Sequence, residues 1–124
     1  MTEWFEELPE QCPPKDAFSP NGQTFYRLVN GQAVTSDDFT SQQAEFPWKE
    51  FLGVDKCISR AVSIFLDKAD CEKMLKFPRH KHKNVYALTL VETDGVVKQT
   101  FKPSHHSWWR TTKFNLKPSN AKEA

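Results

Sequence analysis

The stretch that decides the fold spans residues 84–101 and reads NVYALTLVETDGVVKQTF. Residues 84–92 are rich in β-branched, aromatic and aliphatic side chains, and a second β-branched run follows at residues 96–101. Such side chains favour extended strands. The segment Thr93-Asp94-Gly95 between them is typical of a tight turn, because glycine adopts a positive φ at little steric cost. We therefore predict that these two strands form a β-hairpin.

Two further strands and a helix are expected before this hairpin. The run from Thr24 to Val29 ends at Asn30-Gly31, which favours a turn, and residues 58–65 form another β-branched run. Asp67 is a good N-cap for a helix from residue 68 to about 77, which Pro78 ends.

A first, shorter helix is expected from Thr35 to about Ala44, because Thr35 and Asp38 have the spacing of a capping box. Residues 45–57 hold Pro47, Gly53 and several aromatics and are typical of a loop over the core. A last strand is expected near residues 112–116.

The order of these elements predicts an α+β domain with a small, mostly antiparallel sheet and two short helices. An irregular acidic arm, residues 1–22, precedes it and contains four prolines. The domain is expected to span residues 23–117, followed by a polar tail at 118–124. At 124 residues, the chain has the length of one domain.

The cysteines and the hydrophobicity pattern bear on location. Cys12, Cys57 and Cys71 form no CxxC pair and are odd in number, so we expect reduced thiols. The N-terminal residues lack the basic start and apolar stretch of a signal peptide, and no apolar run is long enough to span a bilayer. A cytoplasmic, membrane-free protein is expected, with the oligomeric state left open.

Charge is distributed unevenly along the chain. Residues 1–72 carry thirteen Asp or Glu against six Lys or Arg, whereas residues 73–124 carry three acidic against eleven basic residues. If the fold separates the halves, the basic half would attract an anionic ligand. If the halves interdigitate, the charges pair. The sequence leaves both alternatives open.

The first candidate site is the segment SHHSWWR, residues 104–110. Its histidines, His105 and His106, can exchange protons near neutral pH, and we assign them a catalytic role. The indoles of Trp108 and Trp109 offer stacking surfaces, and Arg110 can bind phosphate. The alternative is that both tryptophans are buried in the core and the histidines bind neighbouring polar groups.

The second candidate site is a basic cluster after the second helix. It consists of Arg79, His80, Lys81, His82 and Lys83. Such a cluster can bind phosphate groups, and its affinity would fall with salt. We expect no metal site, because these lysines would repel a cation from the histidines, and no cofactor is expected.

Part of the pattern resembles known proteins. The strand at residues 25–29, residues 61–65 before the capped helix, and the Ser-His-His-x-Trp-Trp segment resemble small uncharacterised bacterial proteins. The layout also resembles the compact ADP-ribosyltransferase-like fold. That resemblance implies a catalytic Arg27, a ligand-binding Ser63 and an NAD-type ligand. Its late-strand Glu has no counterpart, and Gln99, His105 and His106 are the nearest polar candidates.

Three functions follow from these patterns. The first is a binding domain for an anionic ligand, which is a nucleotide, a nucleic acid or an acidic protein. The second is a nucleotide- or RNA-directed enzyme, either ADP-ribosyltransferase-like or a His-dependent ribonuclease, of the kind found in toxin or defence systems. The third is an immunity or antitoxin-like partner that binds another protein through the aromatic arm and the loop at residues 46–48.

Overall fold

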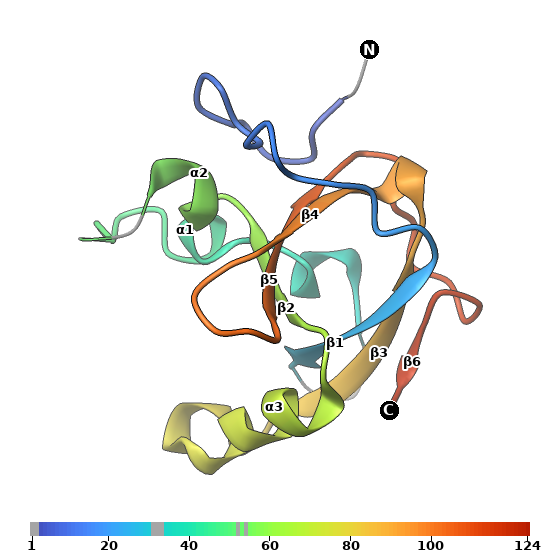
Figure 1. Ribbon diagram of the computed structural model, residues 1–124. Helices are drawn as coiled ribbons and strands as arrows, with labels where there is room; N and C mark the ends of the chain where they lie inside the picture. The colour runs from blue at the N-terminus through green and yellow to red at the C-terminus, as the bar shows by residue number, and fades with distance from the viewer. Residues whose placement is uncertain (1–2, 31–33, 52, 54) are drawn as a thin grey trace.

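The computed structural model describes residues 3–30, 34–51, 53 and 55–124 of the chain. Within these residues, six strands form one antiparallel sheet in the order β4-β5-β2-β1-β3-β6, accompanied by three short α-helices. The α+β class with an antiparallel sheet is therefore confirmed. The sheet is strongly curved, and two of the helices lie close together while the third lies apart from them (Figure 1). Among the described residues, no helix is long and apolar enough to cross a membrane.

The bounds of the elements are as follows. The strands are β1 (Gln23–Val29), β2 (Val62–Phe65), β3 (Asn84–Leu90), β4 (Gly95–Gln99), β5 (His105–Arg110) and β6 (Ala121–Glu123). The α-helices are α1 (Gln42–Glu45), α2 (Lys56–Ser59) and α3 (Lys68–Lys73). Short 3-10 turns lie at Ser36–Asp38, Met74–Lys76, Pro78–His80 and Glu92–Asp94.

One face of the curved sheet carries the hydrophobic core. Because side chains alternate between the faces of a strand, every second residue of the central strands points inward. Phe39 and Phe114, from segments outside the sheet, pack edge to face with a ring-centroid distance of 5.7 Å and belong to the same core. The other buried core residues are Phe25, Val29, Val62, Ile64, Leu88, Leu90, Val97, Trp108 and Ala121.

The predicted hairpin at residues 84–101 is wrong, although both of its strands exist. β3 pairs with β1 and β6, whereas β4 pairs with β5, so the two strands lie in different parts of the sheet. The turn is held by Asp94, whose carbonyl accepts the Trp108 indole N–H at 3.1 Å and the Thr111 N–H at 3.0 Å. These bonds direct the chain toward β5 instead of back along β3.

Gly95 is required where β4 begins. Its φ is +135°, and a Cβ at this position would lie 2.1 Å from the main-chain oxygen of Trp109. The glycine therefore permits the close approach of β4 to β5.

The predicted helix from Thr35 to Ala44 is two separate pieces. The Thr35–Asp38 capping box is present, since the Thr35 N–H donates to the Asp38 carboxylate at 2.8 Å. The helix does not continue, because side chains bind the carbonyls that its next turn would use. Arg27 donates to the Asp38 and Thr40 carbonyls, and Arg110 donates to those of Ser36 and Phe39.

The region around residues 56–65 also differs from expectation. Residues 56–59 form α2, capped by the Asp55 carboxylate at 2.7 Å from the Cys57 N–H, and the strand begins only at Val62. The third helix agrees better with the prediction. Asp67 caps α3, which continues as the 3-10 turn at Met74–Lys76 before Pro78.

The C-terminal residues are ordered differently from the prediction. Residues 112–116 form no strand. Residues 121–123, which we expected in a polar tail, form β6 and pair with β3. Leu88 lies opposite Ala121, which is buried against the core. This apolar contact and the free edge of β3 explain why so polar a segment joins the sheet.

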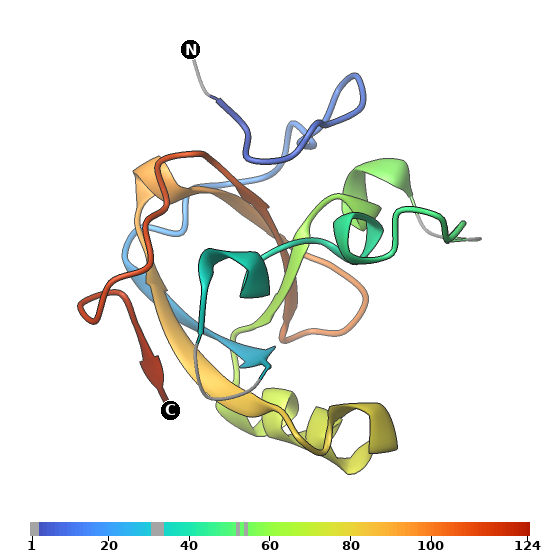
Figure 2. The ribbon, with the colours of Figure 1, turned by 180° about the vertical axis from the view of Figure 1, so that it is seen from behind.

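The arm docks on its own domain. Phe18 and Val97 exchange main-chain hydrogen bonds of 2.9 and 2.8 Å, which occupy the outer edge of β4. Nearer the N-terminus, the Glu6 carboxylate accepts the Ser41 N–H at 2.8 Å. In Figure 2 the arm, in blue, runs along the top of the molecule and passes behind the orange strand, β4. Phe5 also lies over the Arg110 guanidinium, 3.7 Å from ring centroid to Cζ.

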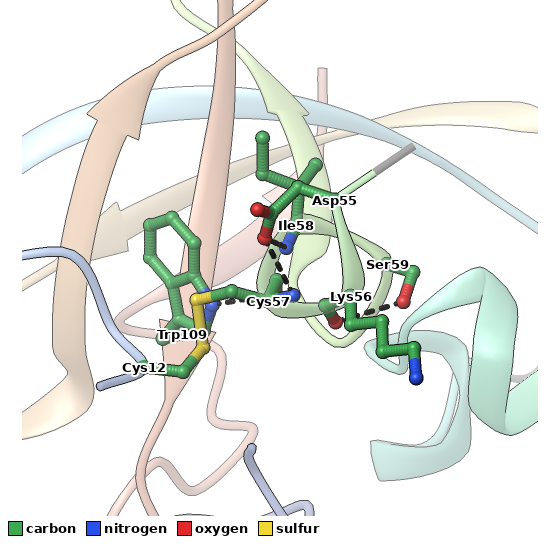
Figure 3. Close-up of a disulfide and its surroundings, with 7 residues drawn as sticks. All are labelled: Cys12, Asp55, Lys56, Cys57, Ile58, Ser59 and Trp109. Atoms are coloured by element: carbon green, nitrogen blue, oxygen red, sulfur yellow. Dashed lines mark hydrogen bonds between the residues drawn. A yellow bond between two sulfur atoms is a disulfide. The ribbon is translucent and has the colours of Figure 1, made fainter. Parts of the chain in front are cut away.

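A disulfide joins Cys12 of the arm to Cys57 of α2, so the expectation of three reduced thiols is wrong (Figure 3). The two residues are 45 positions apart, a pairing that the spacing does not reveal. Disulfides are typical of oxidising compartments. The cysteines therefore give no support to the cytoplasmic location, which stays a prediction. Cys71 is free and buried, and burial raises the pKa of its thiol to about 12.

Candidate functional site

A cleft of about 770 Å³ lies over the outer face of β2 and β5. Ser63, Phe65 and His105 line it from these strands. It is also lined by residues 42–51, by the loop at residues 101–102, and by residues 74–83 after α3. Figure 1 shows these segments around the same side of the sheet, with the β4–β5 loop between α1 and α3.

Ser63 and His105, which line the cleft, belong to a hydrogen-bonded chain of four side chains. The Ser63 Oγ lies 2.5 Å from Nε2 of His105, and Nδ1 of His105 lies 3.0 Å from Oγ1 of Thr100. Thr100 Oγ1 is in turn 2.9 Å from Oγ of Ser107. Strand pairing creates this arrangement, because Phe65 lies opposite His105 and Ser63 lies opposite Ser107. Ser63, Phe65, His105 and Ser107 therefore share one face of the β2–β5 pair, and Thr100 directly follows β4, the neighbour of β5.

The imidazole of His105 is kept neutral at neutral pH. Burial lowers its pKa below the usual range, a hydrogen bond to the main chain of Thr100 partly opposes this shift, and the nearby His106 and Lys102 lower the pKa further. A neutral histidine has one nitrogen that accepts and one that donates. In the tautomer with the proton on Nδ1, Ser63 donates to Nε2 and the Nδ1–H donates to Thr100, which is the protonation state of a general base.

The cleft is strongly cationic. Lys49, Arg79, Lys83 and Lys102 line it, and Glu45 is the one carboxylate among the described lining residues. Burial lowers the pKa of His80, and the nearby charges of Lys83 and Arg79 lower it further. Burial also lowers the pKa of Lys83, despite the opposing charge of Glu45. Of the ion pairs found among the described residues, none engages a lining cation.

The structure thus brings most of the basic cluster to His105 and Ser63. Arg79, His80, His82 and Lys83 line the cleft, whereas Lys81 is exposed outside it. The Arg79 Nε donates to Nε2 of His80 at 3.2 Å. Of the eleven lysines and arginines in residues 73–124, the cleft is lined by Arg79, Lys83 and Lys102.

Arg27 combines a structural position with a place in the cleft wall. Its guanidinium donates to the carbonyls of Asp38, Ser63 and Thr40 at 2.8, 2.7 and 3.2 Å. Burial lowers its pKa to about 10, so it stays charged at neutral pH. Three of its five N–H groups are thus occupied by the main chain. We therefore assign Arg27 an organising role instead of the catalytic role expected.

His106 lies on the opposite face of β5 from the cleft, which corrects its expected catalytic role. It is 6% exposed, packs against Phe25 with ring centroids 5.4 Å apart, and donates from Nδ1 to the Ser104 carbonyl at 3.0 Å. Alternation along the strand separates it from His105.

Trp108, Trp109 and Arg110 are structural and do not reach the cleft, contrary to the expected ligand-binding roles. Both tryptophans are at most 1% exposed, and their indole N–H groups donate to the carbonyls of Asp94 and Cys57. Arg110 is enclosed by Phe5 and Phe114 and donates to Ser36 and Phe39. Figure 3 shows Trp109 beside the Cys12–Cys57 disulfide.

Other aromatic rings provide surfaces at the cleft instead. Phe46, Phe51, Phe65 and Phe101 line it. Phe101 is 69% exposed, and its ring centroid is 5.4 Å from that of His105. A smaller cavity of about 140 Å³ adjoins the cleft, since Ser63, His105, Phe51 and Phe101 line both. Ile58 and Ala61 complete its apolar wall.

Sequence reasoning missed several of these residues. Thr100, Lys49, Lys102 and Phe101 carry no local motif, and they reach the site only because the β4–β5 loop and the segment after α1 lie over β2. One signal was available for the Ser63–His105 pair. Ser63 alternates with the apolar Val62 and Ile64, and His105 alternates with His106, but the pairing of β2 with β5 is needed to bring the two polar residues together.

No group of three or more His, Cys, Asp or Glu side chains in the described part of the chain is placed to hold a metal ion. No protein-family model, curated protein or solved structure matches the chain. The functional assignment therefore depends on the geometry of the cleft.

Proposed function

We propose that this protein binds a small anionic ligand of nucleotide size in the cleft over β2 and β5. The observation that carries the proposal is the concentration of cationic side chains around one cavity. Lys49, Arg79, Lys83 and Lys102 line it, and among the described lining residues Glu45 is the one carboxylate. A low-dielectric cleft lined by one sign of charge attracts ligands of the opposite sign.

The size of the cleft favours a small molecule over a nucleic acid duplex or a protein surface. Pockets for small ligands and cofactors span about 300–1,000 Å³, and this cleft has about 770 Å³. The aromatic rings of Phe51 and Phe101 at the cleft supply the stacking surfaces that a base or another planar group would use. A nucleotide combines such a group with phosphates, and an NAD-type ligand belongs to the same class.

Calorimetric titration with ATP, NAD and AMP, each at low and moderate salt, tests this proposal. We expect saturable one-to-one binding that weakens with salt, because the ligand neutralises lysine and arginine charges. Trp48 gives a second readout, since it is 79% exposed and lies between Phe46 and Lys49, which both line the cleft. Its fluorescence should change on binding, and Trp48→Phe should remove that change.

Matched charge variants localise the binding. Arg79→Gln and Lys83→Gln should each weaken ATP binding by about five- to tenfold, the loss expected for one phosphate contact of about 1–1.4 kcal/mol. Lys122→Gln removes an exposed lysine of β6 away from the cleft and should leave the affinity unchanged. Equal effects of all three variants, or tighter binding of duplex DNA than of every nucleotide, would contradict the proposal.

The docked arm argues for the ligand-binding function over the partner-protein function. The disulfide and the main-chain bonds of Phe18 engage the arm within its own domain. The loop at residues 46–48 is exposed, but Phe46 also lines the cleft. If nucleotides bind and Trp48→Phe leaves their affinity unchanged, the loop at residues 46–48 would have a role separate from nucleotide binding.

A further inference from the structure

The Ser63–His105–Thr100 chain has the organisation of an activated nucleophile. Nucleophilic catalysis by serine needs a base within about 2.6–3.2 Å and a third group that orients the base. Here the base lies 2.5 Å from the serine oxygen, and Thr100 holds the other ring nitrogen at 3.0 Å. The Phe65 and Phe101 rings lie 5.2 and 5.4 Å from the imidazole, between centroids, and limit its movement.

The location of Ser63 points to a reaction as well as to binding. Ser63 and His105 line both the large cationic cleft and the small apolar cavity, so a ligand that spans the two passes the Ser63 hydroxyl. A core serine that only satisfies hydrogen bonds does not need to line a cavity. Ser107, which is 2% exposed on the same face, lines the small cavity but not the cationic cleft, so of these two serines Ser63 alone lines both.

From this geometry we propose that Ser63 is the nucleophile of an ester hydrolase, with His105 as its general base and Thr100 as the residue that positions His105. The substrate class is a carboxylic ester with a short apolar acyl group, for the small cavity, and an anionic alcohol portion, for the cationic cleft. The choice of the anionic portion rests on the proposed function, whereas the role of Ser63 does not.

The reaction balances without a metal or cofactor. The Ser63 hydroxyl proton passes to Nε2 of His105 while Oγ bonds to the ester carbonyl carbon, and the collapsing intermediate expels the alcohol, which takes the proton from His105. Water then attacks the acyl-Ser63 ester with His105 as base, and releases the carboxylic acid and free Ser63. Burial lowers the pKa of His105, so the base is available at neutral pH.

A neutral fluorophosphonate reagent tests the nucleophile independently of anion binding. The reagent phosphonylates activated serines, and intact-mass spectrometry with peptide mapping locates the adduct. We expect one adduct on Ser63 in the wild type and none on Ser63→Ala. Ser59→Ala is the matched control, because Ser59 also lines the small cavity but donates to the Lys56 carbonyl. It should be labelled like the wild type.

Variants of the general base, His105, and of the positioning residue, Thr100, should slow the labelling of Ser63 to different degrees. His105→Gln should slow labelling at least a hundredfold, within the range that general-base catalysis supplies. Thr100→Val should slow it less and, by removing the partner of Nδ1, move the midpoint of the rate-against-pH curve, which a purely structural role would not do. Circular dichroism shows whether each variant folds. Labelling of Ser63 at the same rate in His105→Gln, or no labelling of folded wild type, overturns the proposal.

Ester substrates then separate this inference from the proposed function. Hydrolysis of 4-acetoxybenzoate should exceed that of neutral phenyl acetate, and Lys83→Gln should remove the preference. If Ser63 is labelled but both esters react equally, the nucleophile stands and the anionic selectivity is wrong. If ATP binds at the cleft but Ser63 is never labelled, the binding function stands and the hydrolase is wrong.

Discussion

His105 and His106 are neighbours in the sequence but belong to different parts of the molecule. His105 faces the cationic cleft and contacts Ser63 and Thr100, whereas His106 faces the core and packs against Phe25. The same division runs along β5, where Ser107 shares the outer face with His105 and Trp108 shares the core face with His106. Because side chains alternate along a strand, one histidine lies at the cleft and its neighbour packs in the core.

The largest effect should come from the core face. Trp108→Ala removes a fully buried indole and its hydrogen bond to Asp94, and should lower the free energy of unfolding by about 3–5 kcal/mol. Phe101→Ala on the cleft side should change stability far less, since Phe101 is 69% exposed. Urea denaturation of both variants measures the two free energies of unfolding. Equal losses of stability would contradict the difference between the two faces.

The next largest effect concerns the part of the outer sheet face around Trp109, which the arm and α2 cover. There, the Cys12–Cys57 disulfide holds the arm and α2 over Trp109. Cys57→Ser should lower the free energy of unfolding by about 2–4 kcal/mol, as typical for the loss of a native disulfide. Reducing the wild type should produce the same loss without changing the cysteine count. A thermal unfolding midpoint that reductant leaves unmoved would show that the disulfide does not stabilise the arm.

The two histidines should respond differently to substitution. His106→Ala should lower the free energy of unfolding by about 1–3 kcal/mol, because it removes one of the two donors to the Ser104 carbonyl and empties part of the core. It should leave ATP affinity unchanged. His105→Ala should alter ATP affinity and remove fluorophosphonate labelling. Parallel calorimetry and denaturation give both quantities, and a loss of ATP affinity in His106→Ala would contradict the division between faces.

The smallest effect is the pH dependence of anion binding. Burial and neighbouring cations lower the pKa values of His80 and Lys83 in the free protein, and a bound anion offsets the effect of these cations. Binding therefore takes up protons, and affinity should rise by about two- to fivefold as the pH falls from about 8 to about 6. NAD suits this titration, because its phosphodiester charge is constant over the range. His80→Ala should flatten the dependence, and an affinity that falls on acidification would contradict it.

Local patterns predicted strands better than they predicted partners. Strands were expected at residues 84–92 and 96–101 and form at 84–90 and 95–99, because β-branched and aromatic side chains favour extended backbone. Their pairing depends on contacts distant in sequence. Phe18 occupies the free edge of β4, and the indole N–H of Trp108 holds the turn at Asp94, so the hairpin that the turn residues suggest does not form.

The site was predictable only in part for the same reason. The basic cluster is contiguous in sequence, and its charge was visible as a patch before its position was known. The role of Trp108, Trp109 and Arg110 depended on which face of a strand is buried, which composition does not reveal. The Ser63–His105 contact joins strands 42 positions apart and required the register of β2 with β5.

The most direct test follows the side-chain nitrogens of the four histidines by two-dimensional ¹H–¹⁵N NMR during titration with ATP. We predict that the resonances of His80, His82 and His105 move together and saturate with one affinity, while those of His106 stay in place. Movement of His106 with the others, or no response of the three cleft histidines to saturating ATP, would contradict the assignment of this cleft as the ligand site.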